Sequence, residues 1–129
     1  MRLEEADVPS IGRFRECFTK CENLKKINFP EGYITCKTIN TTEMLDHRAI
    51  FKGCKSLTDV SFFERFKFEK STYLYYKYEF LLDHMFNMCE NITTIKMPNL
   101  KVDSSYNVTK VTLRCFCEKC YRLKTFIFN

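Results

Sequence analysis

Glycine, proline, histidine and tryptophan are all scarce in this chain. Its 129 residues include only three glycines, three prolines, two histidines and no tryptophan. So few glycines and prolines argue against a low-complexity chain or a barrel interrupted by glycine turns. Apolar residues still make up 45% of the sequence, with 13 phenylalanines and 7 tyrosines, which is too apolar for a disordered chain. We therefore expect one globular domain over residues 1–129.

Long apolar segments are also missing. No apolar run approaches the roughly 18 residues that a membrane-spanning helix needs. The first ten residues, MRLEEADVPS, carry three acids and lack the apolar centre of a secretory signal. The expected location is therefore cytoplasmic, unless the chain is a fragment of a surface protein.

One stretch of 14 residues occurs four times, at 17–30, 50–63, 85–98 and 116–129. Its fifth position is always a cysteine: Cys21, Cys54, Cys89 and Cys120. Three residues later comes an aliphatic residue, namely Leu24, Leu57, Ile92 or Leu123, and three later again an apolar one, namely Ile27, Val60, Ile95 or Phe126. Two positions further on stands Phe29, Phe62, Met97 or Phe128. A single copy has one apolar edge that it cannot bury alone, so an internal repeat predicts that the copies stack.

The repeated spacing L-x-x-I-x-F is that of a short strand with alternating apolar and polar residues. The cysteine before each strand is expected in a tight turn, where a buried thiol can form a weak hydrogen bond. We expect the four cysteines to form a structural ladder, one from each copy. The second position of the motif is Phe18, Phe51, Phe86 or, in the last copy, Cys117, and these rings are expected to fill the core.

The string F-x-x-C-x-x-L-x-x-I-x-F-P resembles the BspA-like leucine-rich repeats of bacterial and protist surface proteins. Ile11-Gly12 and Ala49-Ile50-Phe51 are similar to the family's I-G-x-x-A-F sequence. The resemblance extends over the whole chain, although the cysteine spacings of 33, 35 and 31 exceed the family's usual coil by roughly ten residues. It implies an α/β fold, a short leucine-rich-repeat-like solenoid of about four irregular strand–helix coils, and a function in protein recognition.

The segments between the motifs are expected to complete these coils. Residues 33–39 and 100–113 are predicted to be extended, and residues 43–53 and 81–91 to be helical. Aromatic residues at every second position on both sides of a polar turn in 62–80 predict either a hairpin or two separate extended edges.

In repeats of this kind the residues between the inward-facing apolar positions contact the ligand. The resemblance therefore implies eight ligand-facing side chains: Lys26, Asn28, Asp59, Ser61, Thr94, Lys96, Thr125 and Ile127. The expected partner is a protein whose identity the sequence does not give.

We predict no catalytic residues, no metal site and no cofactor, and hence no enzyme. The two histidines, His47 and His84, occupy equivalent places after an aspartate and are expected on helix surfaces. The pair Cys117 and Cys120 forms a CxxC, but zinc needs four converging ligands and no second matching pair is present. Without a signal peptide the thiols are expected to be reduced.

Two further interactions remain open. A net charge of +5 and the aromatic and basic segment 66–80 make nucleic-acid binding the alternative function, although 16 acids are dispersed among the 21 bases. The last strand, residues 123–129, is apolar and β-prone and carries a single charge, Lys124. Such an edge is expected to associate with another copy of the chain.

Overall fold

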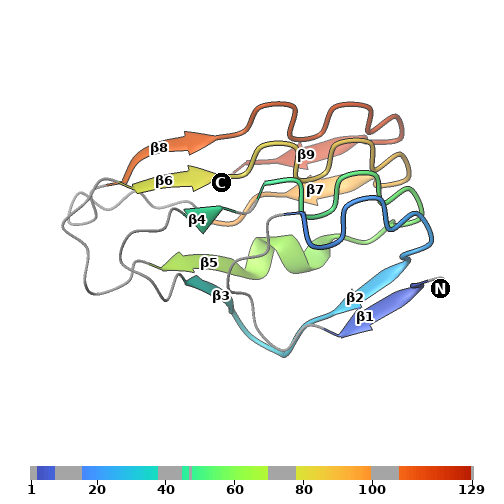
Figure 1. Ribbon diagram of the computed structural model, residues 1–129, viewed down its shortest axis with the longest axis horizontal. Coiled ribbons are helices and arrows are strands. Elements are labelled where there is room, and N and C mark those ends of the chain that lie inside the picture. The colour runs from blue at the N-terminus through green and yellow to red at the C-terminus, as the bar shows by residue number, and fades with distance from the viewer. Residues whose placement is uncertain are drawn as a thin grey trace.

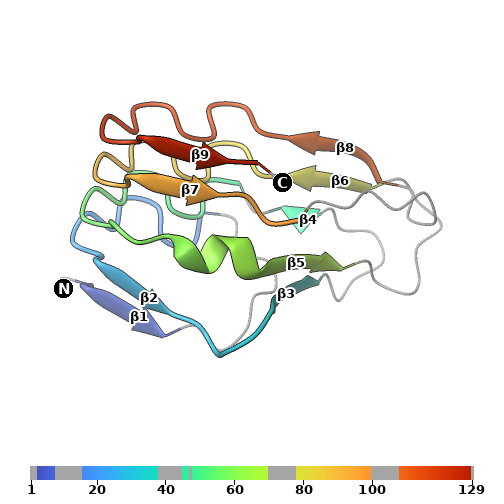
Figure 2. The same cartoon turned by 180° about the vertical axis from the view of Figure 1, so that it is seen from behind.

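A computed structural model describes residues 3–7, 16–37, 45–46, 48–69, 78–99 and 108–128 (Figures 1 and 2). Within these ranges the backbone forms nine short strands, one 3-10 helix and no α-helix. The strands are β1 (Glu5–Asp7), β2 (Lys26–Asn28), β3 (Ile34–Lys37), β4 (Leu45–Asp46), β5 (Phe66–Glu69), β6 (Tyr78–Leu81), β7 (Thr94–Lys96), β8 (Val108–Thr112) and β9 (Thr125–Ile127). The 3-10 helix, η1, spans Ser61–Arg65.

The strands form four separate small sheets, and every pairing is parallel. The sheets are β1–β2, β3–β5, β4–β6–β8 and β7–β9. The predicted α/β solenoid of about four strand–helix coils is therefore wrong. The described residues contain no α-helix, and irregular backbone connects short strands that do not join into one sheet.

Within the two predicted helices, residues 48–53 and 83–88 form consecutive tight turns instead, and residues 43, 44 and 47 lie outside the described residues. We call residues 16–20, 48–53, 83–88 and 114–119 the turn segments. In each one, two residues four positions apart take a left-handed backbone conformation, such as Ala49 (φ 55°) and Gly53 (φ 78°) or His84 (φ 60°) and Met88 (φ 62°). Residues with positive φ cannot continue a right-handed helix, so these segments remain turns.

In the first three turn segments, alternate amides donate to the next turn segment, while amides between them, such as that of Lys52 to the carbonyl oxygen of Ala49, close turns within their own segment. The amide of Phe18 donates to the carbonyl oxygen of Ile50 over 2.9 Å, and that of Phe51 to Met85 over 3.0 Å. The amide of Phe86 continues the series to the next turn segment. Figure 1 shows the four turn segments side by side, in the order of the chain. These lateral hydrogen bonds satisfy the backbone that an α-helix would have satisfied internally.

The second motif contains η1 where a strand was predicted. The side-chain Oδ1 of Asp59 accepts a hydrogen bond from the amide of Ser61 over 2.8 Å, and the amide of Phe63 donates to Val60 over 3.0 Å. Both Phe62 and Phe63 are buried, whereas an alternating strand would bury only one of two adjacent residues. As a result η1 lies between β2 and β7, as Figure 2 shows.

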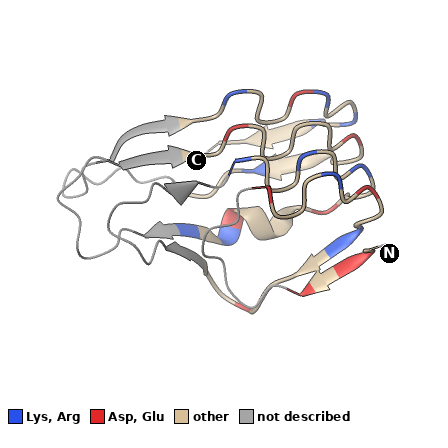
Figure 3. Ribbon diagram, in the orientation of Figure 1, with Lys and Arg blue, Asp and Glu red and all other residues tan. Residues whose placement is uncertain are grey.

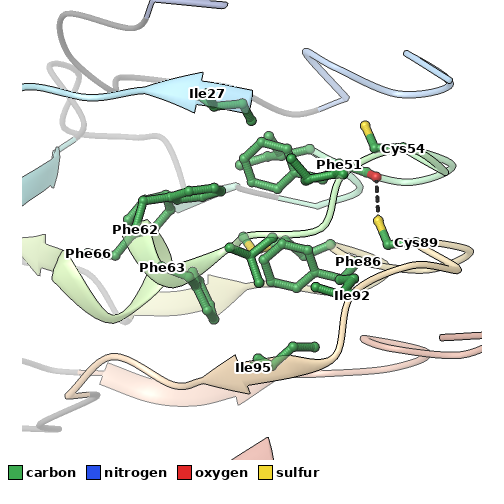
Figure 4. Close-up of a cluster of buried hydrophobic side chains, with 14 of the residues drawn as sticks. Ile27, Phe51, Cys54, Phe62, Phe63, Phe66, Phe86, Cys89, Ile92 and Ile95 are labelled. Carbon is green, nitrogen blue, oxygen red and sulfur yellow. Dashed lines mark hydrogen bonds between the residues drawn. The ribbon is translucent and has the colours of Figure 1, made fainter. Parts of the chain in front are cut away.

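The core lies between the turn segments and the row of β1, β2, η1, β7 and β9. The aliphatic and apolar positions of the first three motifs are all buried in it: Leu24, Leu57, Ile92, Ile27, Val60 and Ile95. The rings of Phe51 and Phe86 stack with their centroids 5.5 Å apart, and Phe18 stacks on the far side of Phe51 at 5.9 Å (Figure 4). In the fourth motif Phe116 replaces the missing ring and meets Phe86 edge to face at 5.3 Å.

The remaining extended segments pair differently from a hairpin. Strand β5 lies within residues 62–80 and β6 begins there, but β5 pairs with β3 while β6 pairs with β4 and β8. The hairpin prediction is therefore wrong, and the alternative of two separate extended edges agrees with the structure. Residues 70–77 lie outside the described residues. Strands β3 and β8 fall where extended backbone was predicted.

Candidate functional site

The eight predicted ligand-facing residues lie along the row of β2, η1, β7 and β9 (Figure 2), and we call this surface the strand face. Six of them occupy strands: Lys26, Asn28, Thr94, Lys96, Thr125 and Ile127. In β2 and β7 the residue between the two polar positions is buried, so the polar ones face outward. In β9 all three residues are exposed.

Asp59 and Ser61 do not lie on a strand. They precede and begin η1, where both side chains are exposed. The prediction placed them on a strand between β2 and β7, but this part of the chain forms the helical turn η1. The reason is the adjacent pair Phe62 and Phe63, both of which the core accommodates.

Two shallow hollows flank Asp59 and Ser61. The first, of about 220 Å³, is lined by Lys26 and Asn28 together with these two residues. The second, of about 280 Å³, is lined by Thr94 and Lys96 together with the same two residues. The structure thus brings six of the eight predicted residues around η1. The other two, on β9, line neither hollow.

The sides of the hollows are held by polar contacts. One guanidinium nitrogen of Arg65 donates to the carbonyl oxygens of Pro30 and Gly32, both over 2.8 Å, which fixes the turn after β2 against η1. On the other side Lys96 Nζ lies 3.4 Å from Glu64 Oε2. Both side chains of this ion pair are partly exposed, so the pair adds at most about 1 kcal/mol and mainly orients Lys96.

The sequence did not predict that β1 belongs to the strand face. Ala6 pairs with Ile27, and this register places Glu5 and Asp7 beside Lys26 and Asn28. The side-chain Nδ2 of Asn28 donates to Glu5 Oε1 over 2.5 Å and to Asp7 Oδ1 over 2.8 Å. The only sequence signal is the polar–apolar–polar pattern of three residues, which is too short to predict a strand.

The cysteine ladder is built from thiol hydrogen bonds between neighbouring motifs. Cys54 Sγ donates to the carbonyl oxygen of Phe18 over 3.2 Å, and Cys89 Sγ to that of Phe51 over 3.0 Å (Figure 4). The thiol of Cys120, in the fourth motif, donates in the same way to the carbonyl oxygen of Phe86 in the third motif. Removal from water raises the pKa of Cys54 to about 12 and also raises that of Cys89. These two thiols therefore stay protonated at neutral pH and are suited to a structural role.

The other cysteines of the described chain are less enclosed. Cys21, which begins the ladder, is half-buried, and Cys17 is exposed. Cys115, Cys117 and Cys120 are each half-buried, and the seven cysteines whose side chains the structure describes are free thiols. In the ranges that the structure describes, no three side chains of His, Cys, Asp or Glu come together as a metal site would require.

The prediction that the histidines lie on helix surfaces is wrong for His84. This residue sits in a turn segment with φ 60°, and its Nδ1 lies 3.4 Å from the side-chain nitrogen of Asn87. His47 lies outside the described residues. Among the described helices none is long and apolar enough to cross a membrane.

Part of the aromatic and basic segment 66–80 belongs to the core. Phe66 is buried and packs edge to face against Phe63 at 5.2 Å, so its ring is not exposed to a ligand. Lys67 is exposed, with its Nζ 5.7 Å from the centroid of the Tyr33 ring. The tyrosines at 73, 75 and 76 lie outside the described residues.

Comparisons with protein-family models, with curated proteins and with solved structures found no match. Any functional conclusion must therefore come from the surface chemistry of the chain itself.

Proposed function

We propose that this chain is a non-enzymatic protein-recognition module whose strand face binds a segment of a partner protein. One observation carries the proposal. Polar side chains from three separate motifs surround η1, where two hollows share Asp59 and Ser61. The buried core beneath holds these side chains on rigid backbone, which lowers the entropy lost when a partner binds.

The size of the hollows favours a protein partner over a small molecule. Sites for drug-sized ligands usually enclose about 300–1,000 Å³. Both hollows are smaller than this and open, at about 220 and 280 Å³. Each suits one or two side chains of a partner. Because a standard interface covers about 800 Å² on each side, a contact confined to this face will be weak unless several copies bind together.

The charges on the face favour a partner of mixed polarity. Carboxylates of Glu5, Asp7 and Asp59 alternate along the face with the ammonium groups of Lys26 and Lys96. A partner segment that carries both an acid and a base can pair with neighbouring groups here. A uniformly acidic or basic partner would meet repulsion at alternate positions.

The proposal can be tested with a displayed library of random peptides selected on the immobilised chain. The expected peptides carry both charge signs and bind the wild-type chain. Binding should fall at least roughly tenfold, or about 1.4 kcal/mol, in a triple variant with Lys26→Ala, Asp59→Ala and Lys96→Ala.

A matched control removes the same charges from the turn segments and their neighbourhood: Lys52→Ala, Glu90→Ala and Arg114→Ala. This control variant should bind the selected peptides as the wild type does. Peptides that bind the first triple variant as tightly as the wild type, and that no longer bind the control variant, would place recognition elsewhere and contradict the proposal.

Nucleic-acid binding through residues 66–80 is the competing function. The test is binding of single-stranded DNA and RNA over a range of salt concentrations, since phosphate contacts weaken steeply with salt. We expect no salt-dependent binding. A steep salt dependence that a Lys67→Ala substitution reduces would favour the competing function.

A further inference from the structure

The row of β1, β2, η1, β7 and β9 ends in two strand edges that have no strand beside them among the described residues. At one end, Thr125 donates its amide to Thr93 over 3.1 Å and Ile127 accepts from Met97 over 2.9 Å. Backbone groups alternate in direction along a strand, so the N–H and C=O of Phe126 point away from β7. At the other end, β2 is the only strand of the described residues that pairs with β1, so its outer edge has no described strand beside it.

The edge at β9 is apolar and bordered by basic residues. Phe126, Ile127 and Phe128 are 42%, 38% and 62% exposed. The rings of Phe126 and Phe128 stack with their centroids 6.5 Å apart, which makes a continuous apolar strip. The exposed charges within residues 118–128 are three bases and one acid: Lys119, Arg122, Lys124 and Glu118.

The edge at β1 has the opposite charge. Residues 3–7 contain three exposed acids, Glu4, Glu5 and Asp7, and no base. Figure 3 shows acidic residues on β1 at the N-terminal end of the row. Leu3, at the start of this segment, is 39% exposed and adds an apolar side chain.

We infer that β9 of one copy pairs in parallel with β1 of a second copy, so that the chain associates head to tail. Inside the chain a column of apolar side chains on the core side runs through the pairs Ala6↔Ile27 and Ile95↔Phe126. Continuing this column sets Phe126 opposite Ala6 of the second copy.

In that register the chemistry of the neighbouring positions matches as well. Lys124 stands opposite Glu4, and Leu123 stands opposite Leu3. A slip of one residue would set Phe126 opposite Glu5 or Asp7 and turn each apolar side chain to the wrong face of the strand. The head-to-tail register is therefore the one in which apolar and charged positions both find suitable neighbours.

A symmetric contact between two β9 strands fits less well. Two strands related by a two-fold axis run antiparallel, so with Phe126 opposite Phe126 the Lys124 of each copy would face the apolar Phe128 of the other copy and would have no acid opposite it. A head-to-tail contact uses two different surfaces, so every added copy leaves one edge of each kind open. The expected product is a growing series of oligomers and not a closed dimer.

The test is sedimentation velocity of the full chain under reducing conditions, over a concentration series at low and at high salt. The wild type should form species larger than a dimer, and fewer of them at high salt. Lys124→Glu and Glu4→Lys should each be monomeric at concentrations where the wild type associates. Both side chains are exposed, so their thermal unfolding should match that of the wild type.

An equimolar mixture of the two variants provides the decisive measurement. In one type of contact, the glutamate introduced at position 124 faces the lysine introduced at position 4 of the other variant. In the second type, the original Lys124 faces the original Glu4, as in the wild type. The mixture should therefore associate again. Lys52→Glu, in a turn segment, is the control and should behave as the wild type does. A wild type that stays monomeric, a Glu4→Lys variant that associates fully, or a mixture that stays monomeric would each overturn the inference. The second result is the one that a symmetric β9 contact would give.

Discussion

The thiol of Cys89 donates a hydrogen bond of 3.0 Å to the carbonyl oxygen of Phe51, which lies 38 residues earlier in the chain. The same oxygen accepts the amide of Cys54 over 3.1 Å. Each such carbonyl thus uses both lone pairs, one within its motif and one toward the next motif. This arrangement explains why the repeated position is cysteine: the side chain must be small and apolar enough for the core and still donate a proton.

Thiol alkylation should follow the enclosure of each cysteine. In the native chain a short pulse of iodoacetamide should modify the exposed Cys17 first and leave Cys54 and Cys89 unmodified, because a buried thiol with a raised pKa offers almost no reactive thiolate. The half-buried Cys21 should react at an intermediate rate. Peptide mass spectrometry measures each site, with the denatured chain as the control. Native labelling of Cys89 as fast as that of Cys17 would show that the ladder is open.

The buried thiols should make the fold sensitive to alkaline pH. Loss of hydration raises the pKa of Cys54 from an ordinary 9.0 to about 12 in the folded chain. Above pH 9 the unfolded chain releases this proton while the folded chain keeps it, so the free energy of unfolding falls as pH rises. The loss should reach about 2 kcal/mol for this thiol near pH 10.5.

Urea unfolding at pH 7 and near pH 10.5 tests this effect in the wild type and in Cys54→Ala. The variant should be less stable at pH 7 because it leaves a cavity and loses the thiol hydrogen bond, but its stability should fall less as pH rises. An equal fall in both proteins would mean that groups other than Cys54 cause the alkaline destabilisation.

Removing a ring from the stacked phenylalanines should destabilise the chain strongly. Phe51 is buried between Phe18 and Phe86, so Phe51→Ala should lower the free energy of unfolding by about 3–5 kcal/mol. Phe128→Ala, at an exposed ring, serves as the control and should cost less than about 1 kcal/mol. Chemical denaturation measures both. A cost below about 1 kcal/mol for Phe51→Ala would be incompatible with the packing in Figure 4.

The left-handed backbone of the turn segments predicts that glycine is favoured at these positions. Gly53 has φ 78°, and an added Cβ would meet only ordinary contacts at 3.5 Å or more, so Gly53→Ala should cost about 1 kcal/mol through backbone strain alone. Met88 takes the equivalent conformation, with φ 62°, without being glycine. Met88→Gly should relieve that strain and cost much less than the usual loss of a methionine side chain. Thermal unfolding measures the stability of Gly53→Ala, Met88→Gly and Met88→Ala. A larger loss of stability for Met88→Gly than for Met88→Ala would contradict this explanation.

The sequence predicted which residues enter the core better than it predicted the backbone that carries them. Leu24, Leu57 and Ile92 are buried as their shared position indicated, because burial depends on apolar character at a repeated spacing. The helices at 43–53 and 81–91 could not be excluded from composition. What prevents them is positive φ at residues such as Ala49 and His84, together with hydrogen bonds to residues thirty or more positions away. Neither feature can be recognised in the local sequence.

The sequence predicted that the polar residues of the candidate site share one surface, but it did not predict the shape of that surface. The alternating polar positions do share one face, but the turn at Asp59–Ser61 depends on how the core receives Phe62 and Phe63 together. The strand Glu5–Asp7 was missed for a different reason. Its position comes from pairing with β2, and three residues carry too little periodicity to reveal it.

The lateral hydrogen bonds of the turn segments also govern how the chain must fold. Because Phe18 bonds to Ile50, and Phe51 to Met85, the backbone of one motif is satisfied only when the next has arrived. A peptide that contains a single motif therefore has no stable conformation to adopt, and the smallest nucleus comprises two adjacent motifs with the intervening loop closed. Closing loops of this length costs conformational entropy before the stabilising contacts form, so folding should be slow for a chain of this size. Until the second motif docks, the apolar edge of the first is exposed to solvent, and that interval is when the nascent chain most needs protection from aggregation.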